Sequence, residues 1–216
     1  MAKTYLADTA YDLIRNKILK AEYLPGSTIS EEKLVADLGF SRTPIRSALV
    51  RLEQEHLIKT ISKKGIYIED ISYEHIHDIY ECRLLMEPYA IRNYGNRFSK
   101  KKLQEFCHEF MTQKQDSWEW FLQDNLFHAE IIHLCGNELL NDYYESLQSL
   151  NLRISAYSSA ITDRINLSND EHIAVINALL KDKYEQAAEL LTLHLTKAKD
   201  AAYTILEQTN KEPESN

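Results

Sequence analysis

The sequence has few of the residues that interrupt helices. It contains five glycines and four prolines among 216 residues. Three of the glycines, Gly26, Gly39 and Gly65, lie in the first 65 residues, so the long remainder has few turn-forming residues. This asymmetry predicts two domains, with residues 1–70 forming the first and residues 71–208 forming a second that is almost entirely helical.

Long apolar runs and targeting signals are also absent. The mean hydropathy is -0.42, and no stretch approaches the roughly 18 consecutive apolar residues that would span a bilayer. These features exclude a membrane-embedded protein. The N-terminus has no basic segment followed by an apolar stretch and a small-residue cleavage site, so we expect no secretory signal and a cytoplasmic location.

Cysteine is scarce as well. Cys82, Cys107 and Cys135 are widely spaced and form no C-x-x-C pair. With 216 residues the chain is too long for a disulfide-stapled miniprotein. In an untargeted protein three such thiols are expected to be buried and reduced, and no chemistry is assigned to them.

The net charge of -8 is unevenly distributed. Residues 1–70 carry 11 basic and 10 acidic side chains, whereas residues 71–216 carry 14 and 23. Residues 40–66 contain six basic and two acidic side chains. Because local potential governs the attraction of phosphates, a nucleic-acid partner for the N-terminal segment is compatible with an acidic protein.

Three helices are predicted before residue 57. The first ends at Pro25-Gly26, the second follows the capping residue Ser30 and ends at Gly39, and the third follows Ser41 and covers residues 43–56. Two short helices joined at a glycine form a helix-turn-helix candidate. The apolar stripe of the first helix consists of Leu6, Ala10, Leu13, Ile14, Ile18 and Leu19.

Two β-rich segments follow these helices. Residues 57–61 and 66–70 are separated by a short polar turn that ends in Gly65, which predicts a β-hairpin. A helix-turn-helix followed by a hairpin is typical of a winged helix.

Basic side chains gather at two places in this module. Arg42, Thr43 and Arg46 lie at the start of the third helix, where groove-entering helices present side chains to base edges. Lys63 and Lys64 lie at the tip of the hairpin, where phosphates would lie. The spacing favours double-stranded DNA as the partner, and the alternative is a solvated basic face on a small helix-and-hairpin module.

The segment LPGSTISEEKLVADLGFSRTPIRSALVRLEQEHLI, residues 24–58, resembles the N-terminal domain of GntR-family bacterial transcription regulators. The shared residues are Pro25-Gly26, Glu31, Leu34, Leu38-Gly39 and residues 41–46. The departures are Val35, Ser47 and His56, where the family has Ala, Glu and Gly.

The resemblance implies how the module contacts DNA. Arg42, Thr43 and Arg46 would reach bases or phosphates, Lys33 would reach a phosphate from the second helix, and Gly65 would let the wing backbone approach the minor groove. The complete predicted DNA-binding set is Lys33, Ser41, Arg42, Thr43, Arg46, Lys63, Lys64 and Gly65.

Beyond residue 70 the sequence pattern is helical with few breaks. The expected helices cover residues 71–93, 101–113, 117–135 and 137–160, followed by two from residue 168 onward, where Ser168 and Glu171 form a capping box. Six or seven helices predict an all-α bundle, so the fold class is mainly α: a winged helix-turn-helix followed by a bundle. The polar residues 209–216 are predicted to form a disordered tail.

Four residues of the second domain have metal-ligand character. Asp124 and His128 are four apart and would point to one side of a helix, while His172 and His194 belong to the last two helices. One carboxylate and three neutral imidazoles suit Zn(II), Ni(II) or Mn(II), with open positions for water or a ligand. Taken singly, each histidine is more commonly a hydrogen-bonded core residue.

The same four residues match the pattern Asp-x-x-x-His, followed by two further His, that is typical of the FCD ligand domain of FadR-like GntR regulators. Residues 80–90 are similar to the Arg-x-x-Leu-Glu-x-x-Ala helix of that domain. The resemblance implies a divalent metal ion and a small carboxylate effector, for which Arg83 and Arg153 are the candidate ligands; the alternative for each arginine is a salt bridge or a solvated charge. It also implies a homodimer on a palindromic operator and a ligand-responsive regulator, most simply a repressor.

Two other functions fit parts of this pattern. A metal-dependent hydrolase would use the open metal positions to activate water, but no dedicated general base is evident, because Glu130 follows His128 by two and would face elsewhere. A helical adaptor with a structural metal is the second alternative. Neither alternative explains a basic winged module.

Overall fold

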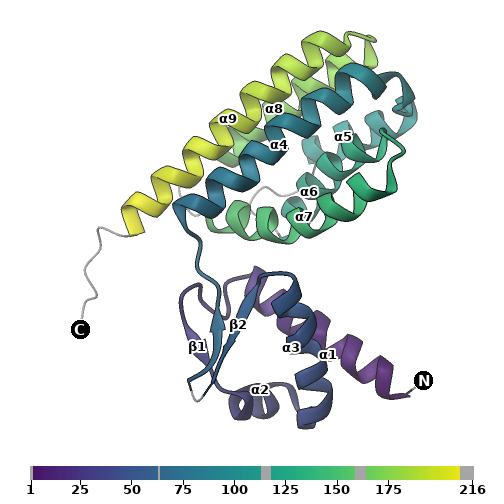
Figure 1. The fold of residues 1–216 in the computed structure, drawn as a ribbon. Coiled ribbons are helices and arrows are strands. Elements are labelled where there is room, and N and C mark those ends of the chain that lie inside the picture. Colours follow the sequence, from purple (N-terminus) through teal and green to yellow (C-terminus); the bar gives the residue numbers. More distant parts are fainter. Residues whose placement is uncertain (1, 63, 113–117, 159–163, 210–216) are drawn as a thin grey trace. The chain divides into compact units, whose positions relative to one another are not determined.

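The computed structural model describes residues 2–62, 64–112, 118–158 and 164–209. The chain divides into two compact units, residues 1–71 and residues 72–216 (Figure 1). No helix within the described ranges is both long and apolar enough to cross a membrane.

The first unit is a winged helix-turn-helix, as the sequence predicts. Its sheet is antiparallel with the strand order β1-β3-β2, and α1 packs against α3. The central strand pairs on both sides, which joins the wing to the rest of the unit. The elements are α1 (Ala2–Leu19), β1 (Thr28–Ile29), α2 (Glu31–Leu38), α3 (Arg42–Gln54), β2 (Ile58–Ile61) and β3 (Gly65–Ile68).

The ends of α2 follow the sequence signals. The Ser30 side chain accepts a hydrogen bond from the backbone N–H of Lys33 at 3.1 Å, and Gly39 ends the helix in the left-handed region with φ 72°. Ser41 is the N-cap residue of α3 and lies within the described residues, but its side chain does not make the expected capping hydrogen bond. His56 has φ 56°, a conformation that favours glycine, which is the residue found here in the resembled family.

The core of the first unit lies between α1, α2 and α3. Ile14, Leu34, Ile45 and Leu52 are at most 1% exposed. The predicted stripe of α1 is partly wrong, because Leu6 and Leu13 are more than 40% exposed. The other four positions of the stripe, Ala10, Ile14, Ile18 and Leu19, are at most 1% exposed.

The second unit is an all-α bundle, as predicted. Among the described residues it contains six α-helices and one short 3-10 helix, with α9 lying beside α4 and α8 (Figure 1). The elements are α4 (Tyr73–Tyr94), η1 (Gly95–Arg97), α5 (Lys100–Thr112), α6 (Trp118–His133), α7 (Glu138–Ser158), α8 (Arg164–Leu180) and α9 (Tyr184–Thr209).

Three expectations for this unit need correction. The capping box is wrong, because α8 begins at Arg164 and Ser168 therefore lies inside the helix, 6% exposed. The predicted tail starts at residue 209, but α9 includes Thr209, and residues 210–216 lie outside the described residues. The three cysteines are free, as expected, but each is partly exposed rather than buried.

Candidate metal centre and nucleic-acid interface

The bundle brings the four predicted metal ligands together. Asp124 and His128 come from one face of α6, His172 from α8 and His194 from α9, and all four are buried. One candidate ligand atom from each residue lies within 4.8 Å of the other three. The site therefore joins α6 to the two consecutive helices α8 and α9.

The distances inside this cluster suit a single cation. Nε2 of His128 lies 3.1 Å from Nε2 of His172, which in turn lies 3.3 Å from Oδ1 of Asp124. Two nitrogen ligands at about 2.0–2.1 Å from one zinc ion would be about 2.9–3.4 Å apart. A metal would thus fit between these nitrogens with little movement of the side chains.

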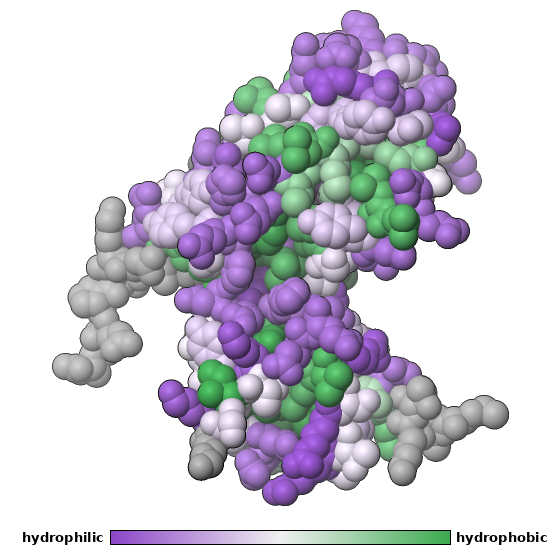
Figure 2. All heavy atoms as spheres, in the orientation of Figure 1, coloured by the Kyte–Doolittle hydropathy of each residue, from purple (hydrophilic) through white to green (hydrophobic). Residues whose placement is uncertain are grey.

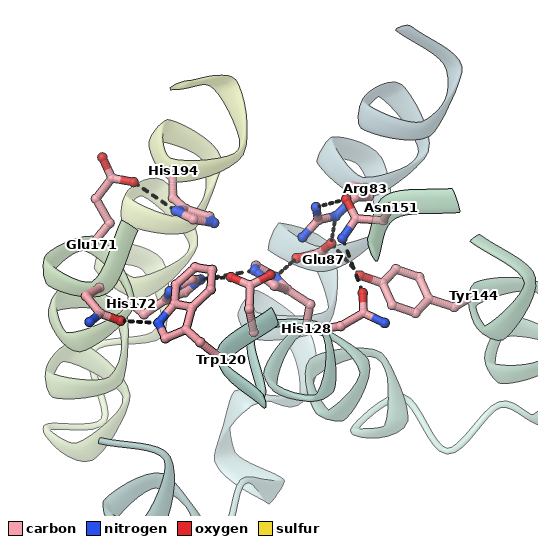
Figure 3. Close-up of polar contacts among 12 residues, drawn as sticks. Arg83, Glu87, Trp120, His128, Tyr144, Asn151, Glu171, His172 and His194 are labelled. Atoms are coloured by element: carbon pink, nitrogen blue, oxygen red, sulfur yellow. Dashed lines mark hydrogen bonds and ion pairs between the residues drawn. The ribbon is translucent and has the colours of Figure 1, made fainter. Parts of the chain in front are cut away.

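Two acidic side chains hold the outer nitrogens of the imidazoles. Nδ1 of His128 lies 2.6 Å from Oε2 of Glu87, and Nδ1 of His194 lies 2.9 Å from Oε2 of Glu171 (Figure 3). Carboxylates in this position orient a histidine so that its other nitrogen faces the metal. Glu171 therefore supports a candidate ligand instead of capping α8.

Aromatic rings close one side of the cluster. The ring of Phe110 stacks on that of His172 with centroids 4.6 Å apart and an angle of 11° between the planes. Phe127 lies edge-on to both His128 and His172. These apolar walls fix the imidazole planes and exclude water from that side.

Arg83 and Glu87 form a buried ion pair next to the cluster. Nε of Arg83 donates to Oε1 of Glu87 at 2.6 Å, and Nη1 of Arg83 donates to Oδ1 of Asn151 at 2.5 Å. The Tyr144 hydroxyl donates to the same Glu87 oxygen at 2.6 Å. Burial alone would raise the pKa of Glu87, but the positive charge of Arg83, together with the hydrogen bonds from His128 and Arg83, lowers it to about 2.

The two predicted effector arginines occupy buried positions. Arg83 is 2% exposed on α4 and reaches the candidate metal ligands through Glu87 and His128. Its Nη2 atom is buried and has no hydrogen-bond partner among the described residues. Arg153 is 4% exposed on α7.

In the winged unit, the predicted DNA-binding side chains are exposed. Lys33 on α2, Ser41 before α3, Thr43 on α3 and Lys64 in the wing turn all face solvent. Lys63 lies outside the described residues.

The two arginines of α3 share an acidic partner on α2. The side chains of Arg42 and Arg46 are 61% and 65% exposed. Nε of Arg46 lies 2.9 Å from Oε2 of Glu31, while Arg42 reaches Oε1 of Glu31 at 3.7 Å and Glu32 at 3.2 Å. These pairs place both guanidinium groups side by side at the start of the helix.

The wing glycine is required by packing within the unit. Gly65 has φ 109°, and a Cβ atom there would lie 2.9 Å from the backbone oxygen of Ile29. The close approach of β3 to β1 thus requires glycine, in addition to any approach of the wing to DNA.

Sequence reasoning missed Glu87, Tyr144, Asn151 and the part played by Glu171. Glu87 lies within the FCD-like motif of residues 80–90, but the motif does not show which histidine it contacts. Tyr144 and Asn151 carry no local signal, because their partners are 57 and 68 residues away.

Comparison with family models gives two matches. Residues 6–68 match the model described as bacterial regulatory proteins, gntR family, and residues 78–197 match that of the FCD domain. The second match covers more than half of the chain.

Relatives along the whole chain agree with these matches. The Nta operon transcriptional regulator of Aminobacter aminovorans is 27% identical over 85% of this chain and 88% of its own length. The gluconate operon transcriptional repressor of Bacillus licheniformis is 26% identical over 84% of this chain and 69% of its own length.

Solved structures show the same fold. McbR/YncC of E. coli superposes with a TM-score of 0.74 at 17% identity, over 92% of this chain and 97% of its own. The Zn2+-bound FCD domain of TM0439 superposes with a TM-score of 0.53 at 23% identity, over 63% of this chain and 96% of its own.

These relatives are regulators of transcription and not enzymes. Glu130, the residue considered as the general base of a hydrolase, pairs with Lys102 at 2.5 Å. The chain belongs to the GntR family of bacterial transcriptional regulators and combines its winged helix-turn-helix with an FCD domain.

Proposed function

We propose that the protein is a cytoplasmic, effector-responsive repressor that binds a palindromic DNA operator as a homodimer. Two curated relatives, from Bacillus licheniformis and Escherichia coli, are named transcriptional repressors. The observation that carries the proposal is the combination of exposed arginines at the start of α3 with a buried cluster of candidate metal ligands in the bundle.

The DNA-binding part rests on Arg42 and Arg46. A guanidinium group that binds a guanine edge in the major groove with two hydrogen bonds discriminates between bases by about 1–3 kcal/mol. Glu31 is the present partner of both arginines, so binding to DNA exchanges an internal ion pair for contacts with bases or phosphates. Lys33, Ser41, Thr43 and the wing residues Lys63, Lys64 and Gly65 would add phosphate and backbone contacts.

The cluster of Asp124, His128, His172 and His194 would hold a divalent metal ion, Zn, Ni or Mn. The donor set, the 3.1 Å separation of two imidazole nitrogens and the two supporting carboxylates all fit such an ion. When bound, the metal supplies a localised positive charge that attracts an oxygen ligand.

The effector would be a small carboxylate. Arg83 offers one nitrogen that the described residues leave without a hydrogen bond, in a buried position close to the cluster. Arg153 supplies a second buried guanidinium group in the same unit. A carboxylate bound here would favour one arrangement of the bundle and so change the affinity for DNA at a distance.

The homodimer would use the outer face of α4 and α7. Leu85 and Tyr89 of α4 are 69% and 53% exposed, and Leu139 and Tyr143 of α7 are 81% and 50% exposed. Figure 2 shows apolar side chains on this side of the second unit, over α4 and toward α6 and α7. A second copy would cover this face, and two recognition helices would then read the two halves of a palindrome.

Selection of binding sites from random DNA, followed by affinity measurements, tests the proposal. We expect a palindromic site, and we expect Arg42→Ala and Arg46→Ala each to weaken specific binding about 10- to 100-fold while affecting nonspecific DNA less. Arg51→Ala is the control, because Arg51 lies at the far end of α3 and pairs with Asp8. Full specificity in both variants would refute the contact assignment.

A further inference from the structure

Glu87 is a fully buried carboxylate at the meeting point of three helices. It extends from α4 and contacts His128 of α6 and Tyr144 of α7 (Figure 3). It is 0% exposed, and each of its oxygens has a short contact with another side chain. The supporting role described above for both carboxylates does not say what the further contacts of Glu87 with Arg83 and Tyr144 add.

The contacts of Glu87 require both of its oxygens to accept hydrogen bonds. Arg83 and Tyr144 both donate to Oε1, at 2.6 Å in each case. Oε2 lies 2.6 Å from Nδ1 of His128. A carboxylate that accepts from all three partners requires His128 to carry its proton on Nδ1.

That proton position determines what His128 can do at the cluster. With Nδ1 protonated, the lone pair of Nε2 points at the space shared with His172, whose Nε2 lies 3.1 Å away. The opposite tautomer would place a hydrogen on Nε2 and remove one ligand from the site. Glu87 therefore selects the form of His128 that binds metal.

The support of His194 is weaker by comparison. The side chain of its partner Glu171 is 16% exposed and is shared with Lys197, which binds the other oxygen at 3.0 Å. Glu87 is held on both oxygens by buried groups and connects the cluster to two further helices, α4 and α7. Movement of either helix would thus reach His128 through Glu87.

We propose that Glu87 is the positioning residue of the metal centre: held by Arg83 and Tyr144, it fixes the tautomer and direction of His128 and ties that ligand to α4 and α7. The inference rests on the proposed metal site. It assigns to α4 and α7, which also carry the proposed dimer face, a direct mechanical connection to metal binding.

Metal binding by the full-length protein tests this role without DNA or effector. Zinc affinity would be measured by competition with a chelator, and the ligand geometry by the visible spectrum of bound Co(II). Glu87→Gln is the informative variant, because glutamine offers one acceptor and one donor group where all three partners donate. Glu130→Gln is the matched control, because Glu130 lies two residues after His128 on the same helix but pairs outward with Lys102.

We expect Glu87→Gln to bind zinc about 10- to 100-fold more weakly and to change the Co(II) spectrum, with Glu130→Gln equal to wild type. If Glu87→Gln does not fold, Tyr144→Phe decides, since it leaves the carboxylate but removes one of its donors. Tyr144→Phe is then expected to weaken zinc binding several-fold. If Glu87→Gln, or Tyr144→Phe where Glu87→Gln does not fold, shows the zinc affinity and Co(II) spectrum of wild type, the positioning role is overturned. If wild type itself binds no metal, the metal site is overturned instead.

Discussion

Replacing Arg83 by Met should destabilise the helical unit strongly. The side chains of Arg83 and Glu87 are 3% and 0% exposed, and their charged atoms are 2.6 Å apart. Arg83→Met leaves the Glu87 carboxylate buried without its cationic partner, for which the usual cost is about 3–5 kcal/mol. At about 3 °C per kcal/mol, this corresponds to a melting temperature about 10 °C lower.

The assay can be confined to the helical unit. Both tryptophans of the chain, Trp118 and Trp120, lie on α6, so tryptophan fluorescence during urea unfolding reports on this unit alone. The metal-free protein would be used, to separate folding from metal binding. The double variant Arg83→Met with Glu87→Met removes both charges and should be less destabilised than the sum of the two single variants. A single Arg83→Met variant within about 1 kcal/mol of wild type, or a strictly additive double variant, would refute the reasoning.

Two further predictions concern the winged unit. Gly65→Ala should cost more than Gly39→Ala in calorimetric unfolding, because both have positive φ but only the first would bring a Cβ atom 2.9 Å from the Ile29 oxygen; equal costs would show that this close approach is unimportant. Burial, together with the hydrogen bond to Glu55, raises the pKa of Tyr11 to about 12. As pH rises, the unfolded chain, with a tyrosine pKa of about 10, loses this proton before the folded protein does. The stability that protonated Tyr11 adds to the folded state is therefore complete below pH 10 and is lost as pH rises toward 12. Tyr11→Phe should therefore flatten the decline in stability over this window in urea titrations, and an unchanged slope would contradict the assignment.

The features predictable from the sequence are those with local signals. Ser30 and Gly39 carry the chemistry of helix ends, so α2 could be located closely. The spacing of Asp124 and His128 places both on one face of a helix, and the family resemblance supplied His172 and His194. These signals either act within a few residues along the chain or come from the FCD motif, whose members lie close together in the folded domain.

The features that were missed depend on distant packing. β1 has two residues and exists because Thr28 pairs with Tyr67, which no local pattern reveals. Leu6 has the same helical spacing as the buried Ala10 and Ile14 but is 43% exposed, a difference that the local pattern does not reveal. Glu87 contacts a histidine 41 residues away, so its role follows only from the packing of α4 against α6.

The central claim is that the bundle binds one metal ion that receives a carboxylate effector. Elemental analysis of the purified protein, combined with thermal melts against a panel of small carboxylates, tests it in wild type and in a His172→Ala, His194→Ala double variant. We predict about one divalent metal per wild-type chain and a carboxylate that, at about 100 times its Kd, stabilises only wild type by about 2.7 kcal/mol. A folded wild-type protein that contains no metal and is not stabilised by any carboxylate would contradict the claim, and the four clustered residues would then serve only core packing. Unfolding of the double variant would instead favour an adaptor with a structural metal.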